Sequence, residues 1–231
     1  MSFGTNLQFL RKMRRQMTQE ELAEKMGVSR QTVSKWELDA VYPEMEKVVE
    51  LCQLFSCTMD QLVREDMALN NAAYSNIREE IVEPFWYLPY TVVSMEPEDD
   101  SITHVNQWAK ELELSNPDVI GWDFPVPSQE LINVHNMHGY TAALVFQEEN
   151  VPQSRKREMI WQDRQKYMAI TIRFPMAAPF QLIPNAYKVL MTHMSVNGIA
   201  HKWDDKQVIS CFERSYHRDG VEYMDVFIAA E

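Results

Sequence analysis

The stretch TQEELAEKMGVSRQTVSKWE, residues 18–37, determines the fold expected for the start of the chain. Thr18 followed by Glu21 is the pattern of a capping box, which predicts the start of a helix, and Gly27 supplies the residue tolerant of a left-handed conformation that ends it. Ser29 is suited to cap the next helix. Two short helices separated by a tight turn are therefore predicted.

The second of these helices has two faces of different character. At 100° per residue, its long polar side chains fall within an arc of about 140°. These side chains are Arg30, Gln31, Ser34 and Lys35. Val33 and Trp36 lie on the opposite, apolar side. Such a helix suits the major groove of DNA, where Arg and Lys donate to guanine and Gln pairs with adenine. For each side chain, an ordinary solvated position is the alternative.

Three further helices are predicted around this pair. A helical apolar pattern covers residues 6–15, and two more cover residues 45–55 and 58–65. Together the five helices predict a small all-α helix-turn-helix bundle over residues 1–66.

Charge is distributed unevenly along the chain. The formal net charge is -12, but residues 1–36 contain seven Lys or Arg against three Glu, whereas residues 67–231 contain thirteen basic and twenty-three acidic side chains. Positive charge is therefore concentrated in the first two or three helices, as contact with phosphates requires.

The cysteines and the absence of long apolar runs bear on location. Cys52, Cys57 and Cys211 lack the paired spacing of a zinc site or a disulfide framework and are predicted to be reduced, mostly buried thiols. No run approaches the roughly 20 apolar residues that cross a bilayer, and the first ten residues do not resemble a signal peptide. A soluble, cytoplasmic protein is expected.

The rest of the chain has a different pattern. Residues 67–83 are polar with scattered apolar side chains and are predicted to be a linker. Beyond it, the order strand, helix, strand, strand occurs twice. The predicted elements cover residues 90–95, 101–112, 119–124 and 139–146, and then 167–174, 184–197, 208–216 and 222–229. Residues 84–231 are therefore predicted to form a duplicated β-α-β-β domain of the α+β class with an antiparallel sheet.

Residues 5–65 resemble the Cro/phage-repressor-type helix-turn-helix family (Xre family). The motifs that carry the resemblance are TQEELA (18–23), GVS (27–29) and SRQTVSKWE (29–37). The resemblance implies that Gln19 holds the DNA backbone and that Arg30, Gln31 and Lys35 face bases. The candidate DNA-binding residues are Gln19, Ser29, Arg30, Gln31, Thr32, Ser34 and Lys35.

Two features depart from that family's pattern. Asp39 stands where its members often have Gly, and the segment 14–16 looks one residue longer than usual. Glu37 is expected to form a structural ion pair with Arg11 or Lys12 rather than to contact DNA.

Residues 84–231 resemble, more loosely, the gyrase-inhibitor-like effector-binding domains of multidrug-responsive regulators. The carriers are residues 179–187, the strand VISCFE (208–213) and the strand YMDVFI (223–228). The resemblance implies an aromatic cavity with a glutamate inside, and Glu213 is the candidate by position. A buried carboxylate among aromatic rings suits an organic cation. The candidate rings are Trp86, Trp122, Phe124, Tyr140, Trp161, Tyr167 and Tyr187. Core packing is the alternative for each ring, and a surface position or structural hydrogen bond for Glu213.

The sequence thus predicts a ligand-controlled, sequence-specific transcription regulator that binds double-stranded DNA as a homodimer. Its expected partners are an operator and a small-molecule effector, with no cofactor and no membrane. The pair His135 and His138 lacks the supporting ligands of a metal site. No enzyme is expected, although a hydrolase using Glu213 with Tyr187 and a ligand-free interaction module remain alternatives.

Overall fold

The computed structural model describes residues 2–67, 71–123, 127–202 and 208–231. The chain divides into two compact units. One contains residues 1–75, 178–201 and 231, and the other contains residues 76–177 and 202–230. Among the described residues, no helix is both long and apolar enough to span a membrane.

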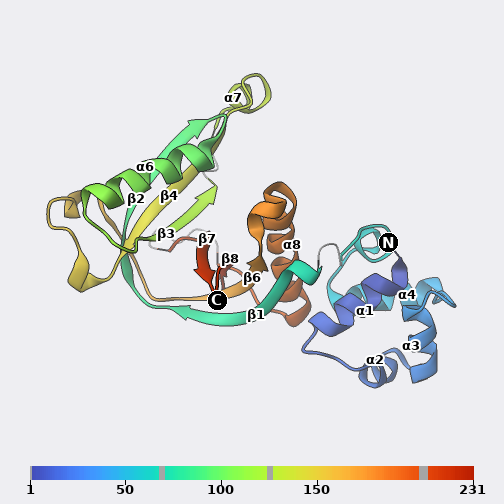
Figure 1. Cartoon of the computed structure of the whole chain (residues 1–231). Coiled ribbons are helices and arrows are strands. Elements are labelled where there is room, and N and C mark those ends of the chain that lie inside the picture. Colours follow the sequence, from blue (N-terminus) through green and yellow to red (C-terminus); the bar gives the residue numbers. More distant parts are fainter. Residues whose placement is uncertain (1, 68–70, 124–126, 203–207) are drawn as a thin grey trace. The chain divides into compact units, whose positions relative to one another are not determined.

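Five helices form the start of the first unit, as predicted (Figure 1). They are α1 (Phe3–Met13), α2 (Gln19–Met26), α3 (Arg30–Glu37), α4 (Met45–Phe55) and α5 (Met59–Val63). Their shared core consists of side chains with no exposed surface: Leu7, Leu10, Leu22, Val33, Leu51, Phe55 and Leu62. The first unit also contains the longer helix α8 (Pro179–Asn197).

The predicted caps of α2 and α3 are confirmed. Thr18 and Glu21 form a reciprocal capping box, in which Thr18 N–H donates to Glu21 Oε2 at 2.6 Å. This hydrogen bond lowers the pKa of the Glu21 carboxyl. Gly27 ends α2 at φ 64°, and Ser29 Oγ accepts from Thr32 N–H at 3.1 Å. These local interactions fix the turn between α2 and α3.

The two features that depart from the family's sequence pattern lie in turns with a strained backbone. Asp39 adopts the left-handed φ of 53° that favours glycine, and its Oδ1 accepts from Gly4 N–H at 2.8 Å. Arg15 and Gln16 are also left-handed, at φ 49° and 58°. The left-handed conformation costs roughly 1–2 kcal/mol per residue. The Asp39 carboxylate offsets part of that cost by satisfying an N–H in the first turn of α1.

The second unit is built on an eight-stranded, curled sheet (Figure 1). Its strands are β1 (Tyr74–Val82), β2 (Phe85–Ser94), β3 (Asp118–Asp123), β4 (His138–Phe146), β5 (Ile160–Gln162), β6 (Gln165–Arg173), β7 (Cys211–Arg218) and β8 (Val221–Ala229). Their order is β1-β6-β8-β7-β3-β4-β2-β5. From β6 to β5, each neighbouring pair runs antiparallel.

The predicted duplication is confirmed by this order. In sequence, β2, α6 (Pro97–Glu111), β3 and β4 form one β-α-β-β repeat, and β6, α8, β7 and β8 follow in the same order, with α8 belonging to the first unit. The sheet places them as β2-β4-β3 and β6-β8-β7, joined where β3 meets β7. Two register pairs, Ile120 with Arg214 and Gly121 with Glu213, make up the described part of this β3–β7 seam.

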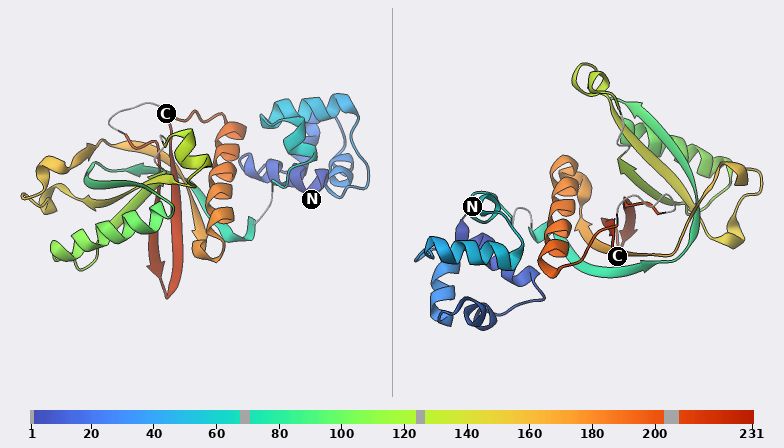
Figure 2. Two further views of the ribbon diagram at one scale, coloured as in Figure 1. Left: turned by 90° about the horizontal axis from the view of Figure 1, so that it is seen from above. Right: turned by 180° about the vertical axis from the view of Figure 1, so that it is seen from behind.

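Helix α6 covers one face of the first repeat. Its buried Val105 and Ala109 share a core with Leu88 of β2 and Leu144 of β4. The two views of Figure 2 show this helix lying along the strands of that repeat. It begins at Pro97, four residues before the predicted start, because a proline and three acidic residues favour a first helical turn without any apolar signal.

Other predicted boundaries were also wrong. Helix α8 begins at Pro179 rather than Pro184, and Pro184 lies inside it, where it lacks the N–H that would donate to Phe180. Gly198 ends α8 at φ 68°, as expected. Strand β2 begins five residues early and continues through Pro89, beyond the residues that pair with β5. Strand β7 begins at Cys211, three residues late, and the predicted end of β3 at residue 124 lies outside the described residues.

Among the described strands and α-helices, three had no sequence prediction. Strand β1 covers residues 74–82 of the expected linker, and the short strand β5 and helix α7 (Gln129–Asn133) lie between the repeats' predicted elements. Strands β1 and β5 occupy the two edges of the sheet.

Candidate functional site

The outer face of α3 carries the predicted polar side chains. Arg30, Gln31 and Lys35 are exposed, and Thr32 and Ser34 are half-buried. Behind them, Val33 is fully buried and Trp36 is 3% exposed. The helix is therefore held to its domain by its apolar side and presents two cations and an amide outward.

A buried ion pair holds α1, α2 and α3 together behind this face. Glu37, the last residue of α3, accepts two hydrogen bonds from the Arg11 guanidinium, at 2.5 and 3.0 Å. The predicted pairing of Glu37 with Arg11 is confirmed. Gln19 Nε2 also donates to Glu37 Oε2, at 2.8 Å. Gln19 is half-buried at the first position of α2, so its amide is oriented from within the domain.

In the second unit, Glu213 and Tyr140 meet across the β3–β7 seam. Tyr140 Oη donates to Glu213 Oε2 at 2.7 Å, and both residues are less than 10% exposed. The tyrosine ring reaches across Gly121 of β3, where a Cβ would lie 2.7 Å from Tyr140 Cε1. Burial, reinforced by the Glu213 charge, raises the pKa of the Tyr140 phenol, which therefore stays a hydrogen-bond donor.

The registers divide the candidate rings between two faces of the sheet. Paired residues share a face and alternate along each strand. The Glu213 face, defined by Glu213, Gly121 and Tyr140, also carries Trp86 on β2 and Trp161 on the edge strand β5. The Arg214 face, defined by Arg214 and its partner Asp225, carries the other two rings in the sheet, Trp122 and Tyr167.

The rings on the Arg214 face are packed into a core. Tyr167 is fully buried and donates from Oη to Ile209 O at 2.7 Å. Trp122 is partly buried and makes an edge contact with Tyr87, with ring centroids 5.8 Å apart. On β5, Trp161 packs against Trp86 at 5.2 Å. Tyr187 belongs to α8 in the first unit, and Phe124 lies outside the described residues. Tyr140 is the candidate ring whose hydroxyl donates to Glu213.

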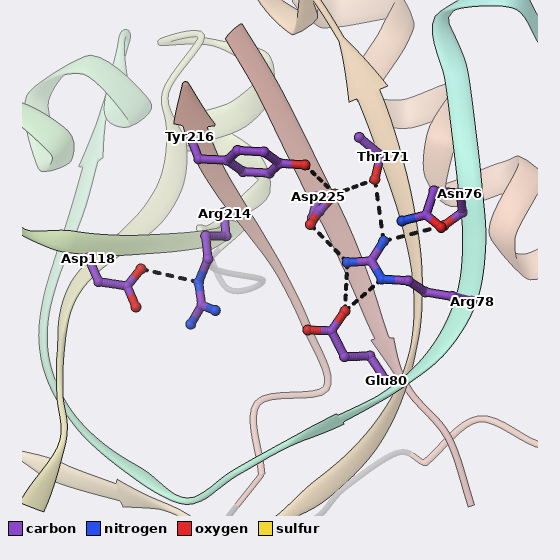
Figure 3. Close-up of polar contacts among 8 residues, drawn as sticks. All are labelled: Asn76, Arg78, Glu80, Asp118, Thr171, Arg214, Tyr216 and Asp225. Atoms are coloured by element: carbon purple, nitrogen blue, oxygen red, sulfur yellow. Dashed lines mark hydrogen bonds and ion pairs between the residues drawn. The ribbon is translucent and has the colours of Figure 1, made fainter. Parts of the chain in front are cut away.

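The Arg214 face also carries a polar cluster that sequence patterns missed (Figure 3). Arg78 of β1 donates to Asp225 Oδ2 at 2.9 Å and to Glu80 Oε2 at 2.7 Å. Thr171 Oγ1 donates to Asp225 Oδ1 at 2.5 Å. One sequence signal pointed to it: Asp225 interrupts the buried, otherwise apolar run at residues 224–229 of β8.

A second ion pair on this face bridges the β3–β7 seam. Arg214 Nε lies 3.2 Å from Asp118 Oδ1, although Nε is buried without a directed hydrogen bond (Figure 3). Burial raises the pKa of the Asp118 carboxyl, and the charge of Arg214 opposes that shift. The seam is thus bridged by Tyr140–Glu213 on one face and by Asp118–Arg214 on the other.

Comparison with known proteins bears on the segment that contains α3 and its exposed polar face. Residues 7–62 match the model of the helix-turn-helix family. That segment is a helix-turn-helix domain. It contains α2, α3 and every candidate DNA-binding residue, so the resemblance drawn from the 18–37 stretch is confirmed.

One curated relative is similar to about a third of this chain, and two solved structures are similar to larger parts of it. The HTH-type transcriptional activator BcrR of Enterococcus faecalis is 40% identical over 76 residues, which are 33% of this chain and 37% of that protein. The chain thus matches little more than a third of the relative's length. A cryo-EM structure of an EcmrR–DNA complex covers 93% of this chain and 85% of its own, at 12% identity and a TM-score of 0.44. A structure of SAV2435 bound to tetraphenylphosphonium covers 68% and 94%, at 11% identity and a TM-score of 0.40.

Beyond the helix-turn-helix domain, Gly121 offers a test of how the Glu213 face is built. We expect Gly121→Ala to lower the free energy of unfolding by roughly 1–3 kcal/mol, because the added methyl group overlaps the Tyr140 ring. Urea denaturation of the full chain would measure the change. In a Tyr140→Val background the same substitution should cost much less, and an equal cost in both backgrounds would rule out this explanation.

Proposed function

We propose that this protein is a sequence-specific, DNA-binding transcription regulator controlled by an organic cation. The observation that carries the proposal is the outer face of α3, where Arg30, Gln31 and Lys35 are exposed while Val33 and Trp36 anchor the helix from behind. Such a helix fits the major groove, with the cations donating to guanine and the amide pairing with adenine. Gln19, Ser29, Thr32 and Ser34 are proposed to contact the backbone or position the helix.

The protein is proposed to act as a homodimer in the cytoplasm. Two copies of α3 would then enter successive major grooves of a near-palindromic site, with half-sites about 34–36 Å apart. Selection of bound duplexes from a random library by the full chain tests this proposal. Enrichment of a near-palindrome with that spacing supports it, and recovery of unenriched sequence contradicts it. Native mass spectrometry of the same sample reports the subunit count.

The effector is proposed to bind on the Glu213 face. Glu213 is a buried carboxylate whose hydrogen bond from Tyr140 crosses the seam between the two repeats. An organic cation gains Coulomb attraction to such a group and cation–π contact with nearby rings. A cation that takes the place of the Tyr140 hydroxyl removes one of the two bridges across the seam. We propose that this loosening is how the ligand changes the DNA-binding form.

Replacing Glu213 with Gln should weaken cation binding by at least about tenfold, because two unit charges near 4 Å attract by roughly 4 kcal/mol at an effective dielectric constant near 20. A panel of aromatic quaternary ammonium and phosphonium cations, titrated by tryptophan fluorescence, provides the measurement. Neutral analogues of the same shape should bind both forms equally.

Glu83→Gln is the matched control, because Glu83 also accepts a hydrogen bond, from Arg164 Nε at 3.2 Å, but lies on the surface. Unchanged cation affinity in Glu213→Gln would remove Glu213 from the ligand site.

We propose that the second unit works by binding rather than by turnover. The hydrolase alternative uses Glu213 as a base, but Glu213 accepts a hydrogen bond from Tyr140, whose raised pKa disfavours proton release. Incubation of the full chain with activated esters and epoxides, followed by product analysis, tests this point. Turnover that is lost in Glu213→Gln would favour the hydrolase.

A further inference from the structure

The end of α4 places two cysteines next to each other. Cys57 N–H donates to Cys52 O at 3.1 Å, and Ser56 N–H donates to Gln53 O at 3.4 Å, with Ser56 at φ 50°. This is a Schellman motif, which commonly brings the side chain two residues past the helix end against the one three residues before it. Here those side chains are Cys57 and Cys52, which the motif places against each other.

We propose that Cys52 and Cys57 form an oxidisable dithiol site that closes to an intrachain disulfide on reaction with a hydroperoxide. A disulfide needs Cα atoms roughly 4.4–6.8 Å apart and facing side chains. The hydrogen bond from Cys57 N–H to Cys52 O keeps the two residues within one turn at the helix end, and a Schellman motif commonly brings these two side chains together. Both side chains are half-buried, so a small peroxide can reach them.

The two thiols have different roles in this reaction. The neighbouring Cys57 thiol partly offsets the rise in the pKa of Cys52, whereas Cys52 adds to the rise in the pKa of Cys57. Burial raises the pKa of both thiols, that of Cys57 to about 12. Cys52 is therefore the attacking thiol and Cys57 the resolving thiol. Because the thiolate is the nucleophile, oxidation is slow at neutral pH and quickens by about tenfold per pH unit below the pKa of Cys52.

The reaction balances with one hydroperoxide. Cys52 thiolate attacks a peroxide oxygen, the O–O bond breaks, and the alkoxide takes a proton to leave as alcohol, or as water from hydrogen peroxide. Cys52 is then a sulfenic acid. Cys57 thiolate attacks the Cys52 sulfur, the S–O bond breaks, and hydroxide leaves as water with a proton. The two thiols lose two protons and two electrons, and the peroxide is reduced by two electrons.

The product is a disulfide cross-link at the end of α4, and it leaves the DNA-binding face of α3 unchanged. It closes a short loop around a turn that already has the required backbone conformation, so little native structure has to move. We expect the oxidised protein to show a higher midpoint of thermal unfolding for the helix-turn-helix domain. The proposal is independent of the operator and of the effector.

Peptide mapping of the full chain tests the site directly. Trypsin releases residues 48–64 as one peptide containing both cysteines, and residues 207–214 as another containing Cys211. After hydrogen peroxide treatment, residues 48–64 should lose the mass of two hydrogen atoms and regain it on reduction. Cys211 is the internal control, because it is the sole cysteine of its unit and burial raises its pKa to about 11.

Two further measurements keep the proposal open to refutation. In Cys57→Ser, dimedone should trap a sulfenic acid on Cys52, while Cys211→Ser should oxidise like the natural protein. Phenylarsine oxide, which bridges adjacent dithiols, should bind the unmodified chain once and remove two free thiols. Disulfides between chains or to Cys211, no arsenical binding, or no rise in the unfolding midpoint after oxidation would overturn the proposal.

Discussion

Replacing Arg30 and Lys35 with alanine is expected to abolish the preference of the protein for its operator over random DNA. Both side chains project from the exposed side of α3, and neither takes part in the core behind it. A good base contact discriminates by about 1–3 kcal/mol, so loss of two should reduce the specificity ratio by roughly thirtyfold or more. Competition binding between the selected operator and scrambled duplexes, at fixed salt, measures that ratio.

The control removes the same charge from elsewhere in the domain. Lys12 and Arg64 are exposed outside α3, so Lys12→Ala with Arg64→Ala should weaken binding to all sequences alike and leave the ratio unchanged. Equal selectivity in the natural and α3 variants would show that another element reads the bases.

The helix-turn-helix domain could be predicted nearly residue by residue because its signals are local. Thr18, Gly27 and Ser29 determine helix ends through hydrogen bonds and backbone angles that involve neighbours within four residues. The apolar side of α3 follows from its periodicity alone. The ion-pair partner of Glu37 was predicted as Arg11 or Lys12, and the structure selects Arg11.

The repeated order of strands and helices could be predicted, but the two edge strands of the sheet could not, nor could the residues that share each face. Strand β1 has charged residues at alternate positions that face the polar cluster, so its sequence lacks the apolar alternation of a half-buried strand. The alternation of side chains also shows which residues share a face only within one strand, not between strands. The registers across β3 place Trp122 and Tyr167 away from Glu213, and no local pattern contains that information.

The contact between Glu213 and Tyr140 shows the same limit in more detail. Both residues were candidates for one ligand site, but they come from β7 and β4, which are not neighbours in the sheet. Tyr140 reaches Glu213 because β3 has a glycine, Gly121, between them. A side chain at that position would separate the pair, so three residues from three strands jointly create this part of the site.

Replacing Glu37 with alanine is expected to cost about 3–5 kcal/mol of unfolding free energy, because removing one partner leaves a buried charge without its counter-ion. The Glu37 side chain is 1% exposed and that of Arg11 is 9% exposed. Two hydrogen bonds from the guanidinium and one from Gln19 are lost together. Urea denaturation of the full chain, followed by far-UV circular dichroism, measures the loss.

The Lys47–Glu50 pair supplies the matched control, because Glu50→Ala also removes a glutamate from an ion pair in the same domain. Its side chains are 33% and 45% exposed, and the pair has a similar distance of 2.8 Å. An exposed pair contributes about 0–1 kcal/mol, since water screens both charges with or without the partner. The difference between the losses of unfolding free energy in the two variants therefore measures the effect of burying the ion pair. Similar losses in both would mean that the Arg11–Glu37 pair does not hold α1 against α3 as the structure indicates.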